Sequence, residues 1–223
     1  MKIGSFIPTD ISDLALWLDA SDSSTITFNG SDASAWADKS GNGKNCVQGT
    51  PSRQPTYNAT GMNSKGTLIF DGSNTTMENA GLSVTQPNTI IIVASQDVQG
   101  SNKKMFDAIN ASPQLIESGS VSDDIQMYAG SNVSSIASIV TIGDPFVCSA
   151  VFNGGSSYLY FNGAYANLGN VGANNLTNYI VGADHSIADF WNGKISEILV
   201  FDKALSDAER RRVEDYAITK WGI

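Results

Sequence analysis

Residues Phe190–Ile223 read FWNGKISEILVFDKALSDAERRRVEDYAITKWGI and predict a β-strand followed by a capped helix. Lys194–Asp202 carries β-branched residues at several of its apolar positions, which is typical of a strand. Ser206 and Glu209 stand three residues apart in the pattern of a capping box, so a helix is expected to begin at about Asp207. We expect this strand and helix to close a β-sandwich, with the helix packed on its side.

The expected helix has one apolar face, formed at three- and four-residue spacing by Val213, Tyr216, Ala217 and Trp221. Gly222 follows the last of these residues and is a natural end for the helix. The basic run Arg210–Arg212 lies beside acidic residues on the same helix. We interpret this run as a solvent-exposed face.

The rest of the sequence predicts many short strands. Its 223 residues include 21 glycines, which suit tight turns because glycine tolerates positive φ angles. Turn signals recur about every 8 to 12 residues, which favours a sandwich or jelly roll of roughly 12 to 14 strands. Ala20–Asn29 is polar and is expected to be a loop, whereas Asn88–Gln96 is the most apolar run and is expected to be a central strand covered on both faces. The other expected strands include Leu14–Asp19, Ser34–Ala37, Asn45–Gln48, Gln54–Tyr57, Thr67–Asp71, Lys104–Ile109, Gln114–Glu117, Ile125–Ala129, Phe146–Phe152, Ser157–Phe161 and Tyr179–Gly182.

Charge and composition argue against several classes of partner. The formal net charge is −9, from 22 acidic and 13 basic residues, so the surface repels phosphate backbones and no nucleic-acid partner is expected. No apolar run reaches the length of a membrane span, and the first residues lack the apolar core of a leader peptide.

Cys46 and Cys148 are far apart in apolar segments, which fits two reduced core thiols or a single disulfide.

Four stretches, in order along the chain, resemble a known family. They are LALWLDASD (Leu14–Asp22), WADKSGNGKN (Trp36–Asn45), LIFDGSN (Leu68–Asn74), and VGAD (Val181–Asp184) with the closing stretch. By these motifs the chain resembles the laminin-G-like branch of the concanavalin A-like lectin/glucanase superfamily. The resemblance implies an all-β fold, a two-sheet antiparallel jelly-roll sandwich with one C-terminal α-helix, in a single domain over residues 1–223. Members include lectin modules, adhesion domains, enzyme accessory domains and virion proteins, so the resemblance specifies the fold more closely than the function.

The sequence lacks a recognisable catalytic constellation. Glucanases of the superfamily carry a Glu-x-Asp-x-x-Glu run, which is absent here, and the adjacent pair Asp123-Asp124 would point to opposite faces of a strand. Glu197 is a lone carboxylate that we interpret as a structural hydrogen-bond partner. His185, next to Asp184, is the one histidine, and no nucleophile elbow accompanies it. We therefore expect no enzymatic activity.

The loop Asp38–Asn45 is the best candidate for a metal site. Its oxygen-bearing residues alternate as in the first half of an EF-hand loop, with glycine at the sixth position, but a second glycine stands where the bidentate Glu is needed. A weak Ca²⁺ site and a hydrogen-bonded Asx-type turn both fit this pattern. The candidate ligands for Ca²⁺ are Asp38, Ser40, Asn42, the carbonyl of Lys44, and Asp71 from a distant loop.

Carbohydrate recognition requires an aromatic platform beside side chains that bind hydroxyl groups. The family topology implies that several loops meet near one end of the sandwich, so our candidates for glycan binding are Trp36, Asn74, Asp184 and His185. The alternative for Trp36, as for Trp17 and Trp191, is a place in the core of the sandwich.

Three functions remain in view. The expected domain begins near the first Met without a leader, so we interpret the chain as a non-enzymatic bacteriophage virion protein, a capsid decoration or tail fibre that assembles in the host cytoplasm. Its expected partners are other virion proteins and a host-surface glycan, and a homotrimer fits such a role. The first alternative is a carbohydrate-binding (lectin) module of a secreted or cell-surface protein, located extracellularly. The second is a polysaccharide-active glycosidase or lyase.

Overall fold

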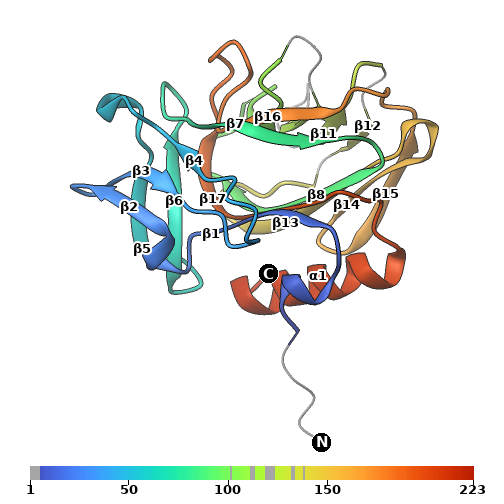
Figure 1. The fold of residues 1–223 in the computed structure, drawn as a ribbon, viewed down its shortest axis with the longest axis horizontal. Helices are drawn as coiled ribbons and strands as arrows, with labels where there is room; N and C mark the ends of the chain where they lie inside the picture. The colour runs from blue at the N-terminus through green and yellow to red at the C-terminus, as the bar shows by residue number, and fades with distance from the viewer. Residues whose placement is uncertain (1–5, 101, 111–113, 119–123, 132–133, 138) are drawn as a thin grey trace, which may run out of the picture.

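The strand β17 (Asn192–Phe201) pairs along both of its edges in one of two sheets (Figure 1). The computed structural model describes residues 6–100, 102–110, 114–118, 124–131, 134–137 and 139–223. One edge of β17 pairs with β8, and its other edge is shared by β6 along Asn192–Ile195 and by β1 along Glu197–Phe201. All of these pairings are antiparallel, so the closing strand of the sequence organises one sheet.

The described residues form 17 strands and one α-helix. The lower sheet of Figure 1 contains β1 (Leu14–Asp19), β6 (Lys65–Asp71), β8 (Asn88–Gln96), β13 (Pro145–Phe152), β14 (Ser157–Phe161), β15 (Ala164–Gly169) and β17. The upper sheet contains β4 (Cys46–Val47), β7 (Met77–Val84), β9 (Lys104–Asp107), β10 (Leu115–Ser118), β11 (Ile125–Tyr128), β12 (Ser134–Ile136) and β16 (Leu176–Val181). Linking strands at one side are β2 (Ile26–Asn29), β3 (Asp32–Trp36) and β5 (Thr56–Met62).

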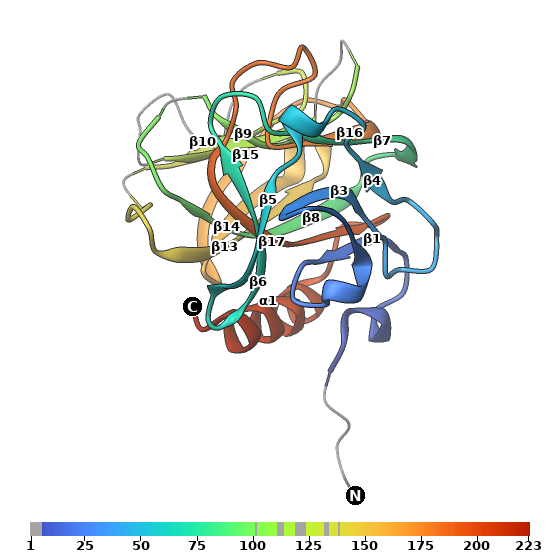
Figure 2. The same ribbon diagram turned by 90° about the vertical axis from the view of Figure 1, so that its left-hand side faces the viewer.

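The two sheets are joined at one side into a continuous antiparallel structure. In the lower sheet the order is β6 and β1, then β17, β8, β13, β14 and β15; in the upper sheet it is β4, β7, β16, β9, β10, β11 and β12. Strands β5 and β3 connect β6 to β4 (Figure 2). At the opposite side β12 contacts β14 and β15, so the sandwich approaches a barrel. The expected all-β antiparallel sandwich with one C-terminal helix is confirmed.

Strand β8 separates two buried apolar clusters. Ile90 and Ile92 belong to the core between the sheets, whereas Ile91 and Val93 belong to a second cluster beneath the helix. Because successive side chains of a strand point to opposite faces, both faces of β8 are covered. This confirms the prediction for Asn88–Gln96.

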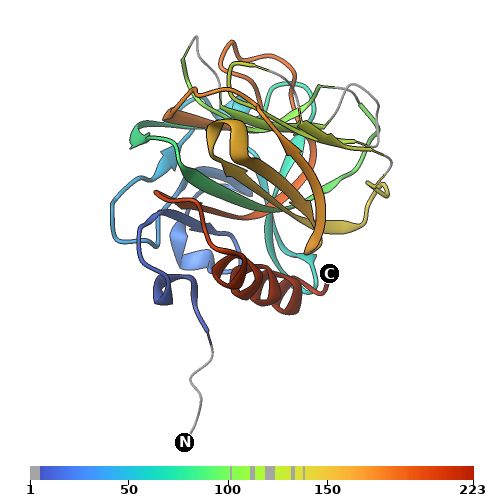
Figure 3. The same cartoon turned by 90° about the vertical axis from the view of Figure 1, so that its right-hand side faces the viewer.

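The helix α1 (Asp207–Trp221) covers the outer face of the lower sheet (Figure 3). Its capping box is complete: the backbone N–H of Glu209 donates to Ser206 Oγ, and the N–H of Ser206 donates to the Glu209 carboxylate at 3.0 Å. Gly222 ends the helix in the left-handed region with φ 71°. Val213 and Trp221 face the sheet and are fully buried. The helix was therefore predicted correctly in position and in its apolar face.

Glu197 joins this helix to the sheet. Its side chain, which is 0% exposed, accepts hydrogen bonds from Trp17 Nε1 at 2.7 Å, Trp221 Nε1 at 2.6 Å and the Tyr216 hydroxyl at 2.8 Å. Lys220 Nζ lies 3.1 Å from the same carboxylate. The structural role expected for Glu197 is confirmed.

Arg210 corrects our interpretation of the basic run. Its side chain is 2% exposed, pairs with the buried Glu214, and places its guanidinium carbon 3.5 Å from the ring centroid of Tyr160. Arg211 and Arg212 are exposed as expected. Arg210 differs because it lies one turn before Val213 and so shares the buried face of the helix.

Three strands lie where the sequence did not predict them: β2, β7 and β12. Strand β2 falls within Ala20–Asn29, which we expected to be a loop, and three of its four residues are exposed. The position of β2 is set by its backbone pairing with β3, and the side chains of β2 form no apolar pattern.

Cys46 and Cys148 are buried and unlinked, in agreement with two reduced thiols. In the described ranges there is no helix with the length and apolarity that a membrane span requires.

Candidate functional site

Trp36 lies in the core and does not form a binding platform. Its side chain is 0% exposed between the two sheets, as are those of many neighbours in the same cluster. A ring that contacts no solvent has no face to offer a sugar, so the proposed glycan-binding role for Trp36 is wrong. The core alternative is correct for Trp36, and Trp17 and Trp191 are buried as well.

The loop after Trp36 folds into a hydrogen-bonded turn around Asp38. One carboxylate oxygen accepts from the backbone N–H groups of Trp17 at 3.0 Å and Ser40 at 2.8 Å. The other accepts from the Ser40 hydroxyl at 2.8 Å and the N–H of Lys44 at 2.9 Å. The Asn42 amide donates to the carbonyl of Leu14 at 2.9 Å. Since donors surround both oxygens, the structure favours the Asx-type turn over the Ca²⁺ loop.

Asp71 cannot complete a metal shell with Asp38. Asp71 pairs with Asn192 at the start of β17, whereas Trp17, which contacts Asp38, pairs with Leu199 seven residues further along. At about 3.3 Å per residue, these positions are roughly 20 Å apart. The prediction that Asp71 joins the four ligands of the Asp38 loop in one Ca²⁺ site is therefore wrong. In the part of the chain that the structure describes, no three His, Cys, Asp or Glu side chains form a group that could hold a metal ion.

Asp71 organises a turn of its own. Its carboxylate accepts hydrogen bonds from the backbone N–H groups of Ser73, Asn74 and Thr75 at 2.9 to 3.2 Å. Partial burial opposes ionisation, but hydrogen bonds from Ser73 and these amides outweigh it and hold the pKa of Asp71 below its usual range. The carboxylate thus stabilises the loop after β6, and the Asn74 side chain is left exposed on that loop.

Asp184 and His185 lie on the loop before β17, and the base of this loop adjoins the turn of Asp71. The connection is made by Asn192, whose amide donates to the carbonyl of Asp71 at 3.3 Å. The two loops that carry Asn74 and His185 therefore leave the same end of the sandwich, at the top of Figure 1. The inference that these loops share one end was correct, whereas the Asp38 loop lies elsewhere.

His185 lies over a buried carboxylate that no sequence pattern singles out. Asp107 of β9 is 0% exposed, and its Oδ2 lies 3.5 Å from His185 Nδ1 and 3.1 Å from the His185 backbone nitrogen. Burial raises the pKa of Asp107 to about 7, opposed by hydrogen bonds from the backbone N–H groups of His185 and Ala108. The nearby Ser186 hydroxyl donates to Asp184 at 2.9 Å, so it is not a nucleophile aligned on His185.

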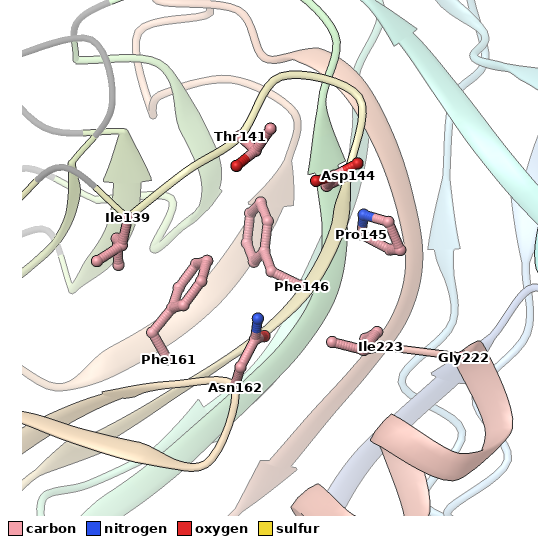
Figure 4. Close-up of a pocket in the computed structure, with 9 residues that line it drawn as sticks. All are labelled: Ile139, Thr141, Asp144, Pro145, Phe146, Phe161, Asn162, Gly222 and Ile223. Atoms are coloured by element: carbon pink, nitrogen blue, oxygen red, sulfur yellow. The ribbon is translucent and has the colours of Figure 1, made fainter.

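A cavity of about 340 Å³ lies where the β12–β13 connection meets the end of β14 and the end of the helix (Figure 4). Its lining comes from parts of the chain that are distant in sequence. The lining residues are Ile139, Thr141, Asp144, Pro145, Phe146, Phe161, Asn162, Gly222 and Ile223. This volume is at the lower end of the range for small-molecule sites.

Two phenylalanines form the aromatic part of this cavity. The rings of Phe146 and Phe161 are stacked with centroids 5.1 Å apart and planes at 28°. Phe146 is fixed in the core, with 1% of its surface exposed, whereas Phe161 is half-buried at the edge of the core. The pair offers a firmly supported ring surface to a ligand.

Three polar side chains surround the aromatic pair in Figure 4: Thr141, Asp144 and Asn162. Asn162 Oδ1 accepts from the N–H of Val147 at 2.9 Å, which leaves the amide NH₂ as a donor on the cavity side. Asp144 is exposed and is the one charged side chain among the described residues that line the cavity. The cavity therefore combines a ring surface, a fixed donor and a carboxylate acceptor.

The sequence interpretation missed this site. Phe146 and Phe161 were read as ordinary strand residues, and Asn162-Gly163 as a turn. The Asn-Gly turn directly after an aromatic strand residue was the available signal, because it fixes the position of a polar side chain beside a ring. The β12–β13 connection lines the cavity only because of the tertiary structure, so no local pattern in the sequence predicts its part in the site.

Comparisons with known proteins agree with this architecture. The Laminin_G_3 profile of the Concanavalin A-like lectin/glucanases superfamily matches residues 84–209, which is more than half of the 223 residues. No curated protein sequence matches the chain.

Several solved structures are similar. Domain 4 of AbnA, a GH43 extracellular arabinanase from Geobacillus stearothermophilus in complex with arabinotriose, has a TM-score of 0.64 and 15% identity over 92% of this chain and 98% of that domain. Trypanosoma rangeli sialidase has a TM-score of 0.64 and 11% identity over 94% of this chain and 34% of the sialidase. A GH54 α-L-arabinofuranosidase has a TM-score of 0.64 and 11% identity over 97% of this chain and 61% of that enzyme. At such identities the likeness shows the fold alone.

Proposed function

Because the chain belongs to the concanavalin A-like lectin/glucanase superfamily, we propose that it is a non-catalytic carbohydrate-binding domain whose cavity beside Phe161 binds a neutral sugar. The observation that carries this proposal is the stacked pair Phe146 and Phe161, flanked by the carboxylate of Asp144 and the amide of Asn162. An AbnA domain of the same fold, solved with arabinotriose, supports a carbohydrate as the class of ligand.

The chemistry of a sugar matches this lining. The C–H groups on one face of a sugar ring are apolar and pack against an aromatic ring, as other apolar groups do. The hydroxyl groups of the sugar both donate and accept hydrogen bonds. Asp144 accepts, the Asn162 amide donates, and the Thr141 hydroxyl does either. A small number of placed polar groups around an apolar surface is the usual composition of a specific small-molecule site.

The charge of the cavity selects against acidic sugars. Asp144 is the charged side chain of the described lining, and the whole chain has a net charge of −9. A sugar carboxylate about 4 Å from Asp144 is repelled by about 1 kcal/mol in water-like surroundings. That corresponds to about a fivefold loss of affinity. Neutral oligosaccharides are therefore the proposed ligands, rather than sialylated or uronic-acid glycans.

The carboxylates support binding rather than hydrolysis. A retaining glycosidase needs two carboxyl groups about 5 Å apart on either side of the bond that is cleaved. Asp144 is the one carboxylate side chain among the described residues that line the cavity. Glu197, which lies on the closing strand, is committed to the indole and phenol donors beneath the helix. The chain is thus proposed to bind glycan without cleaving it.

Calorimetric titration with a panel of neutral trisaccharides (arabinotriose, maltotriose, cellotriose and xylotriose) tests this proposal. Asp144→Ala removes a charge-assisted hydrogen bond and is expected to weaken the best-bound trisaccharide about tenfold. Thr141→Val, which keeps the side-chain shape, is expected to weaken it about threefold. Asp202→Ala removes an exposed carboxylate outside this cavity and serves as the matched control. The proposal is overturned if no trisaccharide binds, or if Asp144→Ala and Asp202→Ala bind equally well.

The location on a virion stays a prediction. A glycan-binding domain on a capsid or tail would attach a particle to its host surface, in agreement with the expected partners. Mass spectrometry of purified particles from the source, together with light scattering of the isolated chain for the expected trimer, checks this prediction. Absence of the protein from purified particles would contradict the location without affecting sugar binding.

A further inference from the structure

A second cavity, of about 450 Å³, lies on the outer face of β14 beside the start of the helix. Leu159 is fully buried in the core between the sheets, so Tyr158 and Tyr160, which flank it in the strand, point to the outer face. Both tyrosines line the cavity, together with Asn153 and Ser156 from the turn before β14. The first cavity lies at Phe161, whose side chain packs against the core, so the two cavities use opposite faces of the same strand.

The tyrosines form a stacked pair. Their ring centroids are 6.2 Å apart, with planes at 19°. Tyr160 is 6% exposed, whereas Tyr158 is half-buried and presents part of its surface to solvent. Tyr158 is therefore the ring that a ligand can reach, and Tyr160 is the support behind it.

A costly buried ion pair fixes this support. Arg210 places its guanidinium 3.5 Å from the centroid of the Tyr160 ring, and it pairs with Glu214, which is 1% exposed. Arg210 Nε and Glu214 Oε1 are buried without a hydrogen-bond partner in the described structure. A buried ion pair with unsatisfied atoms is generally no more stable than apolar residues of similar size. The Arg210–Glu214 pair holds the guanidinium against Tyr160 and so fixes the plane of the Tyr160 ring. A fixed ring suits a rigid binding platform.

Polar groups complete the outer cavity. Asn153 supplies an amide, Ser156 a hydroxyl, and Asp207 at the start of the helix a carboxylate that is 78% exposed. The combination of an aromatic ring with an amide, a hydroxyl and a carboxylate repeats the chemistry of the first cavity.

We propose that the cavity at Tyr158 is a second carbohydrate-binding site, which accepts the same class of neutral oligosaccharide. The ligand class rests on the proposed function of the first cavity. Tyr158 is the platform, and Asn153 and Asp207 bind hydroxyl groups. Arg210 is a positioning residue that acts through Tyr160 and through Asp207, whose Oδ1 lies 3.6 Å from Arg210 Nη2. Two sites on opposite faces of one strand let the domain hold two glycan chains, or two segments of one chain, with a gain in avidity.

Stoichiometry measured by calorimetry with the best-bound neutral trisaccharide of the panel tests this proposal. Wild type is expected to bind two trisaccharides per chain. Tyr158→Ala is expected to bind one, and Asp144→Ala combined with Tyr158→Ala is expected to lose binding at both sites, at least tenfold at each. Tyr158→Phe keeps the ring and is expected to keep two sites. Phe28→Ala, which removes an aromatic ring that is 47% exposed and lies outside both cavities, is the control.

The role of Arg210 is tested by Arg210→Lys, which retains the charge but lacks the planar guanidinium. We expect a three- to tenfold loss of affinity at the outer site, with the first site unchanged. Arg211→Lys, at an exposed neighbouring position, is the matched control. If wild type binds one trisaccharide, and Asp144→Ala weakens that binding whereas Tyr158→Ala does not, the second site is overturned and the proposed function remains intact. Failure of every trisaccharide to bind would overturn both.

Discussion

At the residue scale, Asp107 is a buried carboxylate that the sequence analysis did not single out. It is 0% exposed, and His185, which the sequence interpretation considered as a ligand-binding residue, instead lies over it at 3.5 Å. One of its oxygens, Oδ1, has no hydrogen-bond partner in the described structure. Burial raises its pKa to about 7, against the hydrogen bonds from the backbone of His185 and Ala108.

This shift determines how Asp107 affects stability. Between the usual Asp pKa of about 3.9 and the folded value, the folded state binds more protons at this site than the unfolded state does. The contribution of Asp107 to the free energy of unfolding therefore falls as pH rises from about 4 to about 7, and it is constant above that range.

We predict that Asp107→Asn removes this dependence. Urea denaturation of wild type and variant from pH 4.5 to 8 is expected to show the variant gaining stability relative to wild type as pH rises, with most of the change below pH 7. Asp202→Asn, at an exposed carboxylate, is the control and is expected to show no such trend. A constant difference between Asp107→Asn and wild type over the whole range would contradict the buried, proton-binding state of Asp107.

At the scale of elements, the contact between the helix α1 and the lower sheet depends on one polar centre within an apolar interface. Glu197 on β17 accepts hydrogen bonds from one indole of β1 and from an indole and a phenol of the helix. Burial raises the pKa of Glu197, and the nearby ammonium group of Lys220 opposes this change. This polar centre fixes the register of the helix on the sheet because donors from β1 and from the helix bond to the same carboxylate.

We predict that Glu197→Ala lowers the free energy of unfolding by about 3 to 5 kcal/mol, because the indoles of Trp17 and Trp221 and the hydroxyl of Tyr216 lose their acceptor, whereas Lys220 keeps its ion pair with Asp19. Glu197→Gln keeps an acceptor and is expected to cost about 1 to 2 kcal/mol. Glu78→Ala, at a half-buried carboxylate of β7, is expected to change stability by less than about 0.5 kcal/mol. Urea denaturation at neutral pH checks all three. A cost below about 1 kcal/mol for Glu197→Ala would show that the apolar contacts alone hold the helix.

The elements that the sequence predicted are those with a strong local signal. The helix has a capping box, an apolar face and a terminal glycine, and β8 has an unbroken apolar run. Strand β2 was missed because three of its four residues are exposed and its place depends on pairing with β3. Arg210 was misjudged because the charge of a side chain predicts exposure, whereas its position on the helix determines burial. The aromatic cavity was missed because its lining is assembled from distant segments.

At the scale of the whole molecule, the sandwich separates features that the sequence interpretation had combined. The loops of Asn74 and His185 share one end, the turn of Asp38 lies roughly 20 Å from Asp71, and Trp36 is in the core. The two cavities proposed to bind sugar lie instead on either face of β14. With a net charge of −9, the molecule favours neutral ligands over anionic ones.

The most direct test of carbohydrate binding is a crystal structure of the chain soaked with the neutral trisaccharide that binds most tightly. We predict a sugar ring against Phe161, with its hydroxyl groups hydrogen-bonded to Asp144 and Asn162 at 2.6 to 3.1 Å, in the usual range for such bonds. A trisaccharide bound only at the loops of Asn74 and His185, or no bound sugar at a concentration that saturates the calorimetric signal, would contradict the assignment of this cavity.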